Sequence, residues 1–213
     1  VIDEAQDFGP VEFAIMMDAV SDKHQITIVG DVAQKILSAR KFIGWNKVVD
    51  CLGLEEDSII QLEVSFRCTV PIMTLAHKVA GDPKKVEGRA GSAPEWKKVD
   101  NFVDLVEVLA DWSRGLLRKD PYKLVALICR YPKQAMELKD ELEKMISREV
   151  RIGHRDQFSF EPGVMISNIH QIKGLEFDAV ALINPSEEFY PSKNVESRNM
   201  IYVGITRAQE DLL

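Results

Sequence analysis

Apolar residues along the chain follow two periods that alternate. Short runs of apolar and β-branched residues, bounded by polar or turn-forming positions, are typical of buried strands. They occupy residues 1–2, 25–29, 59–64, 124–129, 164–167 and 179–183. Longer stretches with an apolar residue every three or four positions are typical of amphipathic helices. These stretches occupy residues 12–20, 71–79, 102–117, 132–147 and 199–208.

The order of these elements predicts the fold class. Strands that alternate with helices form α/β proteins, in which a mostly parallel sheet has helices on both faces. Pro71 and Pro132 stand at the first turn of two predicted helices, where a missing N–H is tolerated. Residues 81–94 combine glycine, proline, lysine and serine without a period, so we expect a surface loop there.

Both ends of the sequence fall within predicted strands. Val1 stands where an initiating methionine would be expected, and Leu212 and Leu213 have the composition of the start of a further strand. We therefore expect the sequence to be an excised piece of a longer protein.

Composition narrows the class of protein. The 213 residues suffice for one domain or slightly more, and 46% hydrophobic with 29% charged residues is ordinary for a soluble globular protein. No apolar run approaches the roughly 20 residues that span a bilayer, and no signal peptide is visible. Three scattered cysteines form no CxxC pair, which disfavours a zinc cluster or a disulfide framework. A cytoplasmic protein without a membrane partner fits these features.

The charge balance limits the ways in which the protein could bind nucleic acid. The net charge of −7, from 27 basic and 34 acidic residues, disfavours a protein that coats nucleic acid with its whole surface. It leaves room for a local basic groove. Candidate chemistry therefore has to be sought in short motifs.

Two acidic residues follow the first apolar pair directly. Asp3 and Glu4 would lie at the carboxyl end of a strand, the edge where ligands bind in open α/β sheets. Adjacent carboxylates can hold Mg²⁺ and take a proton from an attacking water, the two tasks of nucleotide hydrolysis. A solvated surface pair is the simpler interpretation, but the preceding strand and residues 5–7 (AQD) favour the catalytic one.

The next strand end also carries polar groups. Gly30 ends the run at residues 25–29, and Gln34 follows one turn later, where its amide could sense a phosphate. In the alternative interpretation this is an ordinary turn from strand to helix, with Asp31 as a capping acid.

Phe66 and Arg67 follow the run at residues 59–64. The ring could stack on an adenine base, and the guanidinium could bind the γ-phosphate. For this pair alone, a core phenylalanine and a surface arginine are the commoner outcome.

Residues 169–178 lie between two predicted core strands. Gly174 allows a close backbone approach, and Glu176 can accept hydrogen bonds from ribose hydroxyls. His170 and Lys173 can meet a nucleic-acid backbone. The alternative is an ordinary glycine-containing loop with a solvated lysine.

An arginine, Arg207, follows the apolar positions of the last predicted helix. Its guanidinium is always charged and offers a planar fork to phosphate oxygens. A lone arginine near a helix end is more often solvated or ion-paired, so its meaning depends on the other motifs.

Five stretches together resemble a known family. In order, they are VIDEAQD, IVGDVAQ, LEVSFRCT, ISNIHQIKGLEFD and IYVGITRAQEDL, and they resemble motifs II, III, IV, V and VI of superfamily 1 helicases of the UvrD/Rep type. The region from Gly30 to Val48 is most similar to the helicase IV or HelD-like branch. Five motifs in the right order over nearly the whole chain make the resemblance specific.

The resemblance implies a role for each matching position. Asp3 would coordinate Mg²⁺, and Glu4 would be the general base for water. The other nucleotide contacts would be Gln34 and Arg67 at the γ-phosphate, Phe66 stacked on adenine, Glu176 at the ribose, Gly174 near the phosphates and Arg207 as the arginine finger. Single-stranded DNA would face His170, Lys173 and Asn168. The implied cofactors are ATP and Mg²⁺.

The sequence departs from the family pattern at several positions. Residues 65–67 read Ser-Phe-Arg in place of Asn-Tyr-Arg, which keeps the aromatic ring and loses a hydroxyl group. Asn168 stands at the threonine of motif V and keeps a hydrogen-bonding group. The aromatic residue that stacks on a base after motif III falls at Leu37 or Ala39. Trp45 would have to replace it, although a core tryptophan is the simpler interpretation.

The resemblance also implies a domain organisation. Residues 1–64 would be the C-terminal remnant of a first RecA-like motor domain of the P-loop NTPase fold, and residues 65–213 a second RecA-like motor domain without the family's large insertion. No GxxxxGK[ST] loop, which cradles nucleotide phosphates, occurs in the sequence. In the family this loop precedes motif II, so we expect it upstream of Val1 and expect the isolated chain to be inactive.

Three functions are compatible with these motifs. The first is the C-terminal part of an ATP-dependent DNA helicase or translocase that moves 3′ to 5′ on single-stranded DNA and hydrolyses ATP in the cleft between two RecA-like domains. The second is an ATP-driven remodeller of a protein–nucleic-acid complex, with RNA polymerase or repair proteins as partners. The third is a degenerate structural domain, which the intact Asp3, Glu4, Arg67 and Arg207 disfavour.

Overall fold

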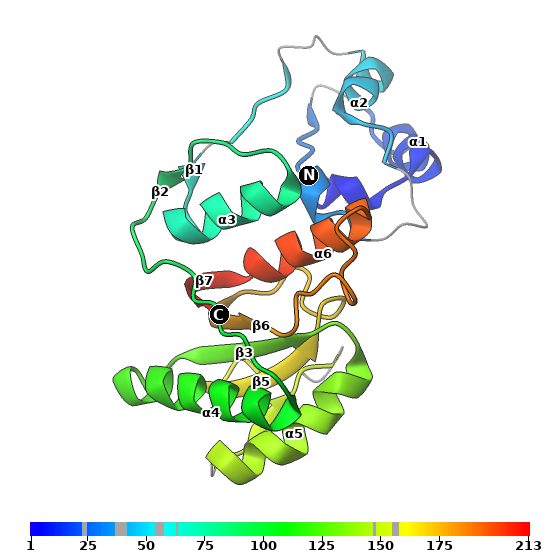
Figure 1. Ribbon diagram of the computed structural model, residues 1–213. Helices are drawn as coiled ribbons and strands as arrows, with labels where there is room; N and C mark the ends of the chain where they lie inside the picture. Colours follow the sequence, from blue (N-terminus) through cyan, green and yellow to red (C-terminus); the bar gives the residue numbers. More distant parts are fainter. Residues whose placement is uncertain (23–24, 37–41, 54–57, 63, 147, 155–157) are drawn as a thin grey trace. The chain divides into compact units, whose positions relative to one another are not determined.

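The computed structural model describes residues 1–22, 25–36, 42–53, 58–62, 64–146, 148–154 and 158–213 (Figure 1). The chain separates into two compact units, Val1–Glu63 and Val64–Leu213, and each is described by itself. No helix among these residues is both long and apolar enough to cross a lipid bilayer.

The first unit consists of short elements around a small core rich in aromatic rings. Its helices are η1 (Ala5–Asp7), α1 (Pro10–Asp18), η3 (Val32–Gln34) and α2 (Trp45–Leu52). Phe13 and Val48 are buried in this core, and the Trp45 ring lies 5.3 Å from the Phe42 ring. Trp45 thus packs against the core, as its simpler interpretation requires.

Two apolar runs of the first unit meet through an isolated parallel bridge between Ile2 and Ile28. Backbone hydrogen bonds of 2.8 Å flank the bridge, one from Ile2 N to Thr27 O and one from Val29 N to Ile2 O. The two runs are therefore neighbours, as expected for strands of one sheet, although neither forms a longer strand.

The strand predicted at residues 59–64 is wrong over most of its length. Ile60 and Leu62 are 83% and 87% exposed, and no strand forms before Val64 in the described part of this segment. Only β1 (Val64–Ser65) pairs, in parallel with β2 (Glu87–Gly88). An apolar run becomes a strand only where a neighbour satisfies its backbone groups, and the sequence pattern does not identify that neighbour.

A five-stranded parallel sheet forms the middle of the second unit and confirms the predicted α/β class (Figure 1). The strand order is β4 (Val150–Ile152), β5 (Gly163–Asn168), β3 (Leu124–Cys129), β6 (Phe177–Leu182) and β7 (Ala208–Leu212). Every residue of the central strand β3 is buried, as its apolar composition predicts. Since all five strands run in one direction, their carboxyl ends meet at one edge of the sheet and their amino ends at the opposite edge.

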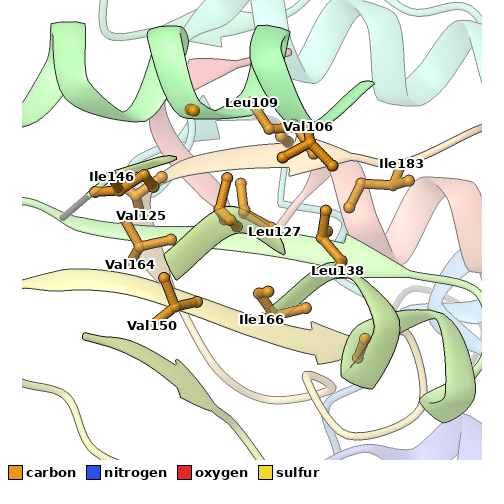
Figure 2. Packing of buried hydrophobic residues seen from close by; sticks show 14 of the residues in the cluster. Val106, Leu109, Val125, Leu127, Leu138, Ile146, Val150, Val164, Ile166 and Ile183 are labelled. Atoms are coloured by element: carbon orange, nitrogen blue, oxygen red, sulfur yellow. The ribbon is translucent and has the colours of Figure 1, made fainter. Parts of the chain in front are cut away.

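Helices cover both faces of this sheet. The helices α4 (Phe102–Lys119) and α5 (Pro132–Ile146) pack on one face, where Val106 and Leu138 join Leu127 in a buried cluster (Figure 2). The helices α3 (Val70–Ala80) and α6 (Val195–Ile205) lie on the other face (Figure 1). A Cβ atom at Gly204 of α6 would stand 3.0 Å from the Leu182 side chain, so glycine allows α6 to approach β6 closely.

The last helix begins and ends earlier than the predicted range of 199–208. Asn194 caps α6 by accepting a hydrogen bond from the Glu196 N–H, and the helix ends at Ile205. Ala208 already belongs to β7, so Arg207 lies in the turn between helix and strand. The strand expected at the last two residues was placed too late because β7 carries polar residues, which an edge strand tolerates and which hide it from an apolar pattern.

Candidate functional site

The two predicted acids follow the Ile2–Ile28 bridge, at the entry to η1. Glu4 has left-handed backbone angles (φ 54°, ψ 39°), and its N–H donates to Asp3 Oδ1 at 2.7 Å. For a residue with a Cβ atom this conformation costs about 1 kcal/mol or more, and such residues gather at functional sites. The turn brings the Asp3 carboxylate onto the Glu4 backbone at the end of the bridge.

A chain of hydrogen bonds joins these acids to the predicted phosphate sensor. Gln6 is fully buried; its amide nitrogen donates to Glu4 Oε2, and its Oε1 accepts from the Asp31 N–H at 2.9 Å. Asp31 caps η3 by accepting from the Ala33 N–H at 2.9 Å, and it also accepts from Gln34 Nε2 at 3.0 Å. The capping interpretation of Asp31 is therefore correct, and the same side chain also orients Gln34.

Gln6 has a linking role that the sequence pattern does not reveal. A Cβ atom at Gly30 would stand 2.5 Å from Gln6 Oε1, so a side chain at position 30 would collide with the amide. The glycine after the apolar run thus makes room for a hydrogen bond between two motifs. No signal in the sequence singles out Gln6, because its burial and its two hydrogen bonds appear only in the fold.

In the second unit, the predicted nucleotide residues Arg67 and Glu176 meet at the amino edge of the sheet. Arg67 Nε lies 2.7 Å from Glu176 Oε1, and both side chains are partly exposed. Gln209 of β7 completes the group, because its Nε2 donates to Glu176 Oε2 at 2.9 Å. Motifs IV, V and VI therefore share one carboxylate, and Gln209 is a member that the sequence did not suggest.

Two further predicted residues, Phe66 and Gly174, lie in open surroundings. Phe66 is 82% exposed, so its ring has an open face. Gly174 has a φ of 82° and no neighbouring heavy atom within 4 Å of a Cβ position. The left-handed backbone, and not crowding, is thus the reason for glycine there.

Arg207 is 1% exposed, in contrast to the open arginine that the motif suggests. Its Nε donates to Val203 O at 3.1 Å, its Nη1 to Leu175 O at 3.2 Å and its Nη2 to Thr206 Oγ1 at 3.1 Å. These bonds connect the end of α6 to the residue just before Glu176. The guanidinium is therefore part of the framework of the site in this structure.

Cys68 fixes the turn that carries Phe66 and Arg67. It is buried, and its thiol donates to Thr206 O at 3.4 Å. Burial raises the pKa of the Cys68 thiol to about 11, against the opposing charges of Arg67 and Arg207. The thiol is therefore neutral at physiological pH and serves as a packing group that ties this turn to the end of α6.

The residues predicted to face nucleic acid lie at the opposite, carboxyl edge of the sheet. Asn168 ends β5, is 4% exposed, and accepts a hydrogen bond from the His170 N–H at 3.2 Å. His170 Nε2 lies 3.3 Å from Arg130 Nη1. Partial burial of the ring and the Arg130 charge lower the pKa of His170, so the imidazole is neutral at pH 7. Lys173 follows in the same connection, where it is half-buried.

Arg130 and Tyr131 extend this edge, although no sequence motif pointed to them. The Arg130 guanidinium lies 5.1 Å from the centre of the Tyr131 ring and 5.4 Å from that of Tyr190. Arg130 Nε and the Tyr190 hydroxyl are buried without a hydrogen-bond partner among the described residues. An arginine next to a tyrosine directly after a buried strand was the available signal.

A cavity of about 590 Å³ lies elsewhere in the second unit. Trp96, Leu105, Ile201 and Leu212 are among its mainly apolar lining residues. None of the predicted site residues lines it, so it is separate from both clusters described above.

Comparison with known proteins finds a family model for the last third of the chain and relatives over a longer part of it. Residues 148–213 match the family model of the UvrD-like helicase C-terminal domain. The chain is 27% identical over 180 residues to the ATP-dependent DNA helicase Rep of Buchnera aphidicola subsp. Schizaphis graminum, covering 81% of the chain and 24% of that protein. It is 29% identical over 132 residues to Rep of Escherichia coli K12, covering 57% of the chain and 17% of Rep. The chain thus spans a quarter or less of these relatives.

A solved structure supports the fold. The C-terminal domain of a possible DNA helicase from Lactobacillus plantarum WCFS1 matches with a TM-score of 0.57 and 23% identity, covering 70% of this chain and 84% of that one. The five-stranded parallel sheet agrees with a helicase C-terminal domain of this kind. The family model and the relatives together support a UvrD/Rep-type superfamily 1 helicase C-terminal part in this chain, and the model matches residues 148–213 of it.

Proposed function

We propose that the chain is part of an ATP-dependent helicase or translocase that moves 3′ to 5′ along single-stranded DNA. The observation that carries the proposal is the shared carboxylate of Glu176, which gathers Arg67 and Gln209 from separate motifs at one sheet edge. The matched relatives, which are named ATP-dependent DNA helicases, support it. Residues 1–64 would then be the end of a first RecA-like motor domain, and residues 65–213 would belong to a second.

The first unit would supply the groups that activate water. Asp3 would hold Mg²⁺, which prefers oxygen ligands and takes only one or two protein carboxylates beside water and phosphate oxygens. Asp3 fits this role in its chemistry, since it offers a carboxylate next to the Glu4 backbone at the end of the Ile2–Ile28 bridge. Glu4 would take the proton from the attacking water, and Gln34 would contact the γ-phosphate.

The second unit would supply the charge that stabilises the phosphoryl group. Arg67 would bind the γ-phosphate, Phe66 would stack on adenine, and Glu176 would accept from the ribose hydroxyls, with Gly174 near the phosphates. Arg207 would act as the arginine finger. Arg207 is 1% exposed, so its guanidinium has to become accessible before it can contact a phosphate oxygen.

The carboxyl edge of the sheet would be the track for single-stranded DNA. His170 and Lys173 would contact its backbone, while Asn168 would act through His170, whose N–H it accepts. Arg130 joins them, because its guanidinium lies beside His170 and carries a buried nitrogen without a partner among the described residues. Residues 169–176 run from this edge of the sheet to the edge that holds Glu176. The same segment would therefore contact DNA at one end and the nucleotide at the other.

The test uses the full-length protein. ATP hydrolysis stimulated by single-stranded DNA should fall by about 10²- to 10⁴-fold in kcat on Glu4→Gln, because a general base is lost. Glu188→Gln, which changes an exposed glutamate of the second unit, is the matched control and should leave kcat unchanged. Turnover that survives Glu4→Gln refutes the assignment of the general base, and wild-type protein without ATP hydrolysis refutes the proposed function.

A further inference from the structure

Arg89 connects two motifs that are far apart in the sequence. It follows β2 in the loop between α3 and α4, and its Nη2 atom donates to two backbone carbonyls. The bond to Arg67 O is 2.6 Å long, and the bond to Gln209 O is 3.2 Å long. Gln209 lies 120 positions further along the chain. One guanidinium nitrogen thus sets the spacing between the turn of motif IV and the strand of motif VI.

The same two residues hold the two oxygens of Glu176 with their side chains. Arg67 Nε is 2.7 Å from Oε1, and Gln209 Nε2 is 2.9 Å from Oε2. Arg89, Arg67, Glu176 and Gln209 therefore form a closed ring of contacts, in which Arg89 joins the backbones and Glu176 joins the side chains. In such a ring, a change of spacing on one side alters the geometry on the other.

The backbone of Arg89 is also fixed against the turn that carries Arg67. Its carbonyl accepts from the Val70 N–H at 2.8 Å, and Gly88 pairs with Ser65 in the β1–β2 ladder. A Cβ atom at Gly88 would stand 2.3 Å from Ser65 O, so the two backbones are in close contact. Arg89 is therefore anchored at its backbone and reaches from there to Gln209.

The exposure of Arg89 argues against a role in holding the fold together. The side chain is exposed, and its bonds join a loop and a turn at the surface. Water can replace an exposed donor at a carbonyl, so losing these bonds affects stability little. Water that replaces Arg89 cannot, however, keep the Arg67 and Gln209 backbones at a fixed distance, and that distance determines the orientation of the Glu176 carboxylate.

We infer that Arg89 is a positioning residue of the nucleotide site, which sets the separation of Arg67 and Gln209 and thereby the orientation of the Glu176 carboxylate. The inference rests on the proposed function, in which Arg67 meets the γ-phosphate and Glu176 the ribose. Arg89 itself touches neither group of the nucleotide. It acts on both through the ring, so its loss alters phosphate binding and ribose recognition together.

The experiment measures steady-state ATP hydrolysis by the full-length protein with ATP and with 2′,3′-dideoxy-ATP. Arg89→Ala should lower kcat/KM for ATP by about 10- to 100-fold, mainly through KM, because misplaced binding groups act with this magnitude. It should also reduce the preference for ATP over the dideoxy analogue, as Glu176→Gln does more fully. Arg89→Lys keeps a charged donor and should be intermediate. Lys85→Ala removes an 86% exposed cation from the same loop and should leave both quantities unchanged.

The possible outcomes separate the two proposals. A normal kcat/KM and a normal ribose preference in Arg89→Ala overturn the inference, while an active wild type keeps the proposed function. A lower melting temperature with both kinetic quantities intact makes Arg89 a purely structural residue and also overturns it. If Arg89→Ala fails to fold, Arg89→Lys and Arg89→Gln decide, because the inference requires a larger loss of ribose preference in the glutamine variant. A wild type without ATP hydrolysis refutes the proposed function, and the role of Arg89 with it.

Discussion

Lys123 forms ion pairs that connect the central strand β3 with the edge strand β7. It directly precedes β3, its side chain is 13% exposed, and its Nζ atom lies 2.6 Å from Asp211 Oδ2 and 2.8 Å from Glu210 Oε2. Because β6 separates β3 from β7, these ion pairs reach across a whole strand. Replacing Lys123 by methionine keeps most of the apolar stem and leaves two neighbouring carboxylates without their cation.

The magnitude follows from the burial of the three groups. An exposed ion pair contributes about 0.2–1 kcal/mol, whereas removing one partner of a fully buried pair costs about 3–5 kcal/mol. Lys123 is mostly buried, but Asp211 and Glu210 are 25% and 49% exposed, so solvent screens part of the interaction. We expect Lys123→Met to lower the free energy of unfolding of the second unit by about 1–3 kcal/mol.

The effect should depend on pH in one direction. Burial alone would lower the pKa of Lys123, but the hydrogen bonds and charges of Asp211 and Glu210 outweigh it and raise the pKa above its ordinary value of 10.5. A raised folded-state pKa gives a stabilisation that is complete below the unfolded-state pKa and is lost as pH rises through the folded-state pKa. The difference between wild type and Lys123→Met should therefore be constant between about pH 7 and pH 9 and shrink at higher pH.

The assay is urea-induced unfolding followed by hydrogen exchange in peptides from residues 124–129 and 208–212, which report on the second unit alone. Lys133→Met is the matched control, because Lys133 forms a surface pair with Glu137 at 3.6 Å and is 88% exposed. It should cost no more than about 0.5 kcal/mol. Equal losses for the two lysines would refute the reasoning, as would a loss at Lys123 that stays unchanged at strongly alkaline pH.

Two further predictions concern the nucleotide and nucleic-acid residues of the full-length protein. Arg207→Lys should lower ATP turnover by about 10³-fold while the Kd for ATP in equilibrium binding changes little; an unchanged turnover removes Arg207 from the site. Lys173→Ala should reduce the slope of log Kd against log salt for oligo-dT by about 0.7, whereas His170→Ala should weaken binding at pH 7.5 without changing the slope. The slope should not change because the lowered pKa of His170 leaves the ring uncharged at that pH. Fluorescence anisotropy titrations measure the slope, and a smaller slope for His170→Ala than for the wild type would contradict this prediction.

The local sequence pattern was sufficient to predict those helices and strands whose conformation depends on their own residues. The apolar run of β3 and the stripe of α4 predict their elements within two residues, because burial imposes a period that the sequence shows directly. The sequence-based predictions fail for the edge strand β7 and for the apolar run before β1, and they fail for opposite reasons. Polar residues form a strand in β7 because β6 lies beside it, and apolar residues at 59–62 form none among the described residues. Both outcomes depend on neighbours that are distant in sequence.

The candidate site likewise has residues that the sequence identifies and residues that only the fold identifies. The motifs single out Asp3, Glu4, Arg67 and Glu176 as candidates, because a reactive group has to be a particular residue type at a particular spacing. The residues that hold them, such as Gln6, are recognisable only through hydrogen bonds across the fold. A glutamine or arginine on a loop has many ordinary explanations, and only its partners select one.

The burial of Arg207 changes how the site has to work. If the arginine finger stood free in solvent, a phosphate could attract it without altering the rest of the unit. Here its guanidinium donates to the carbonyls of Val203 and Leu175 and is 1% exposed, so a phosphate oxygen can reach it only if the end of α6 or the backbone at Leu175 moves. Val203 O also accepts from Thr206 Oγ1 and would keep a donor if Arg207 moved. Leu175 adjoins Glu176 and belongs to the segment that leads back to His170, so a movement of the backbone at Leu175 also acts on the segment that leads to the edge proposed to face DNA. In the proposed mechanism, coupling between the two edges is therefore a consequence of where Arg207 is hydrogen-bonded.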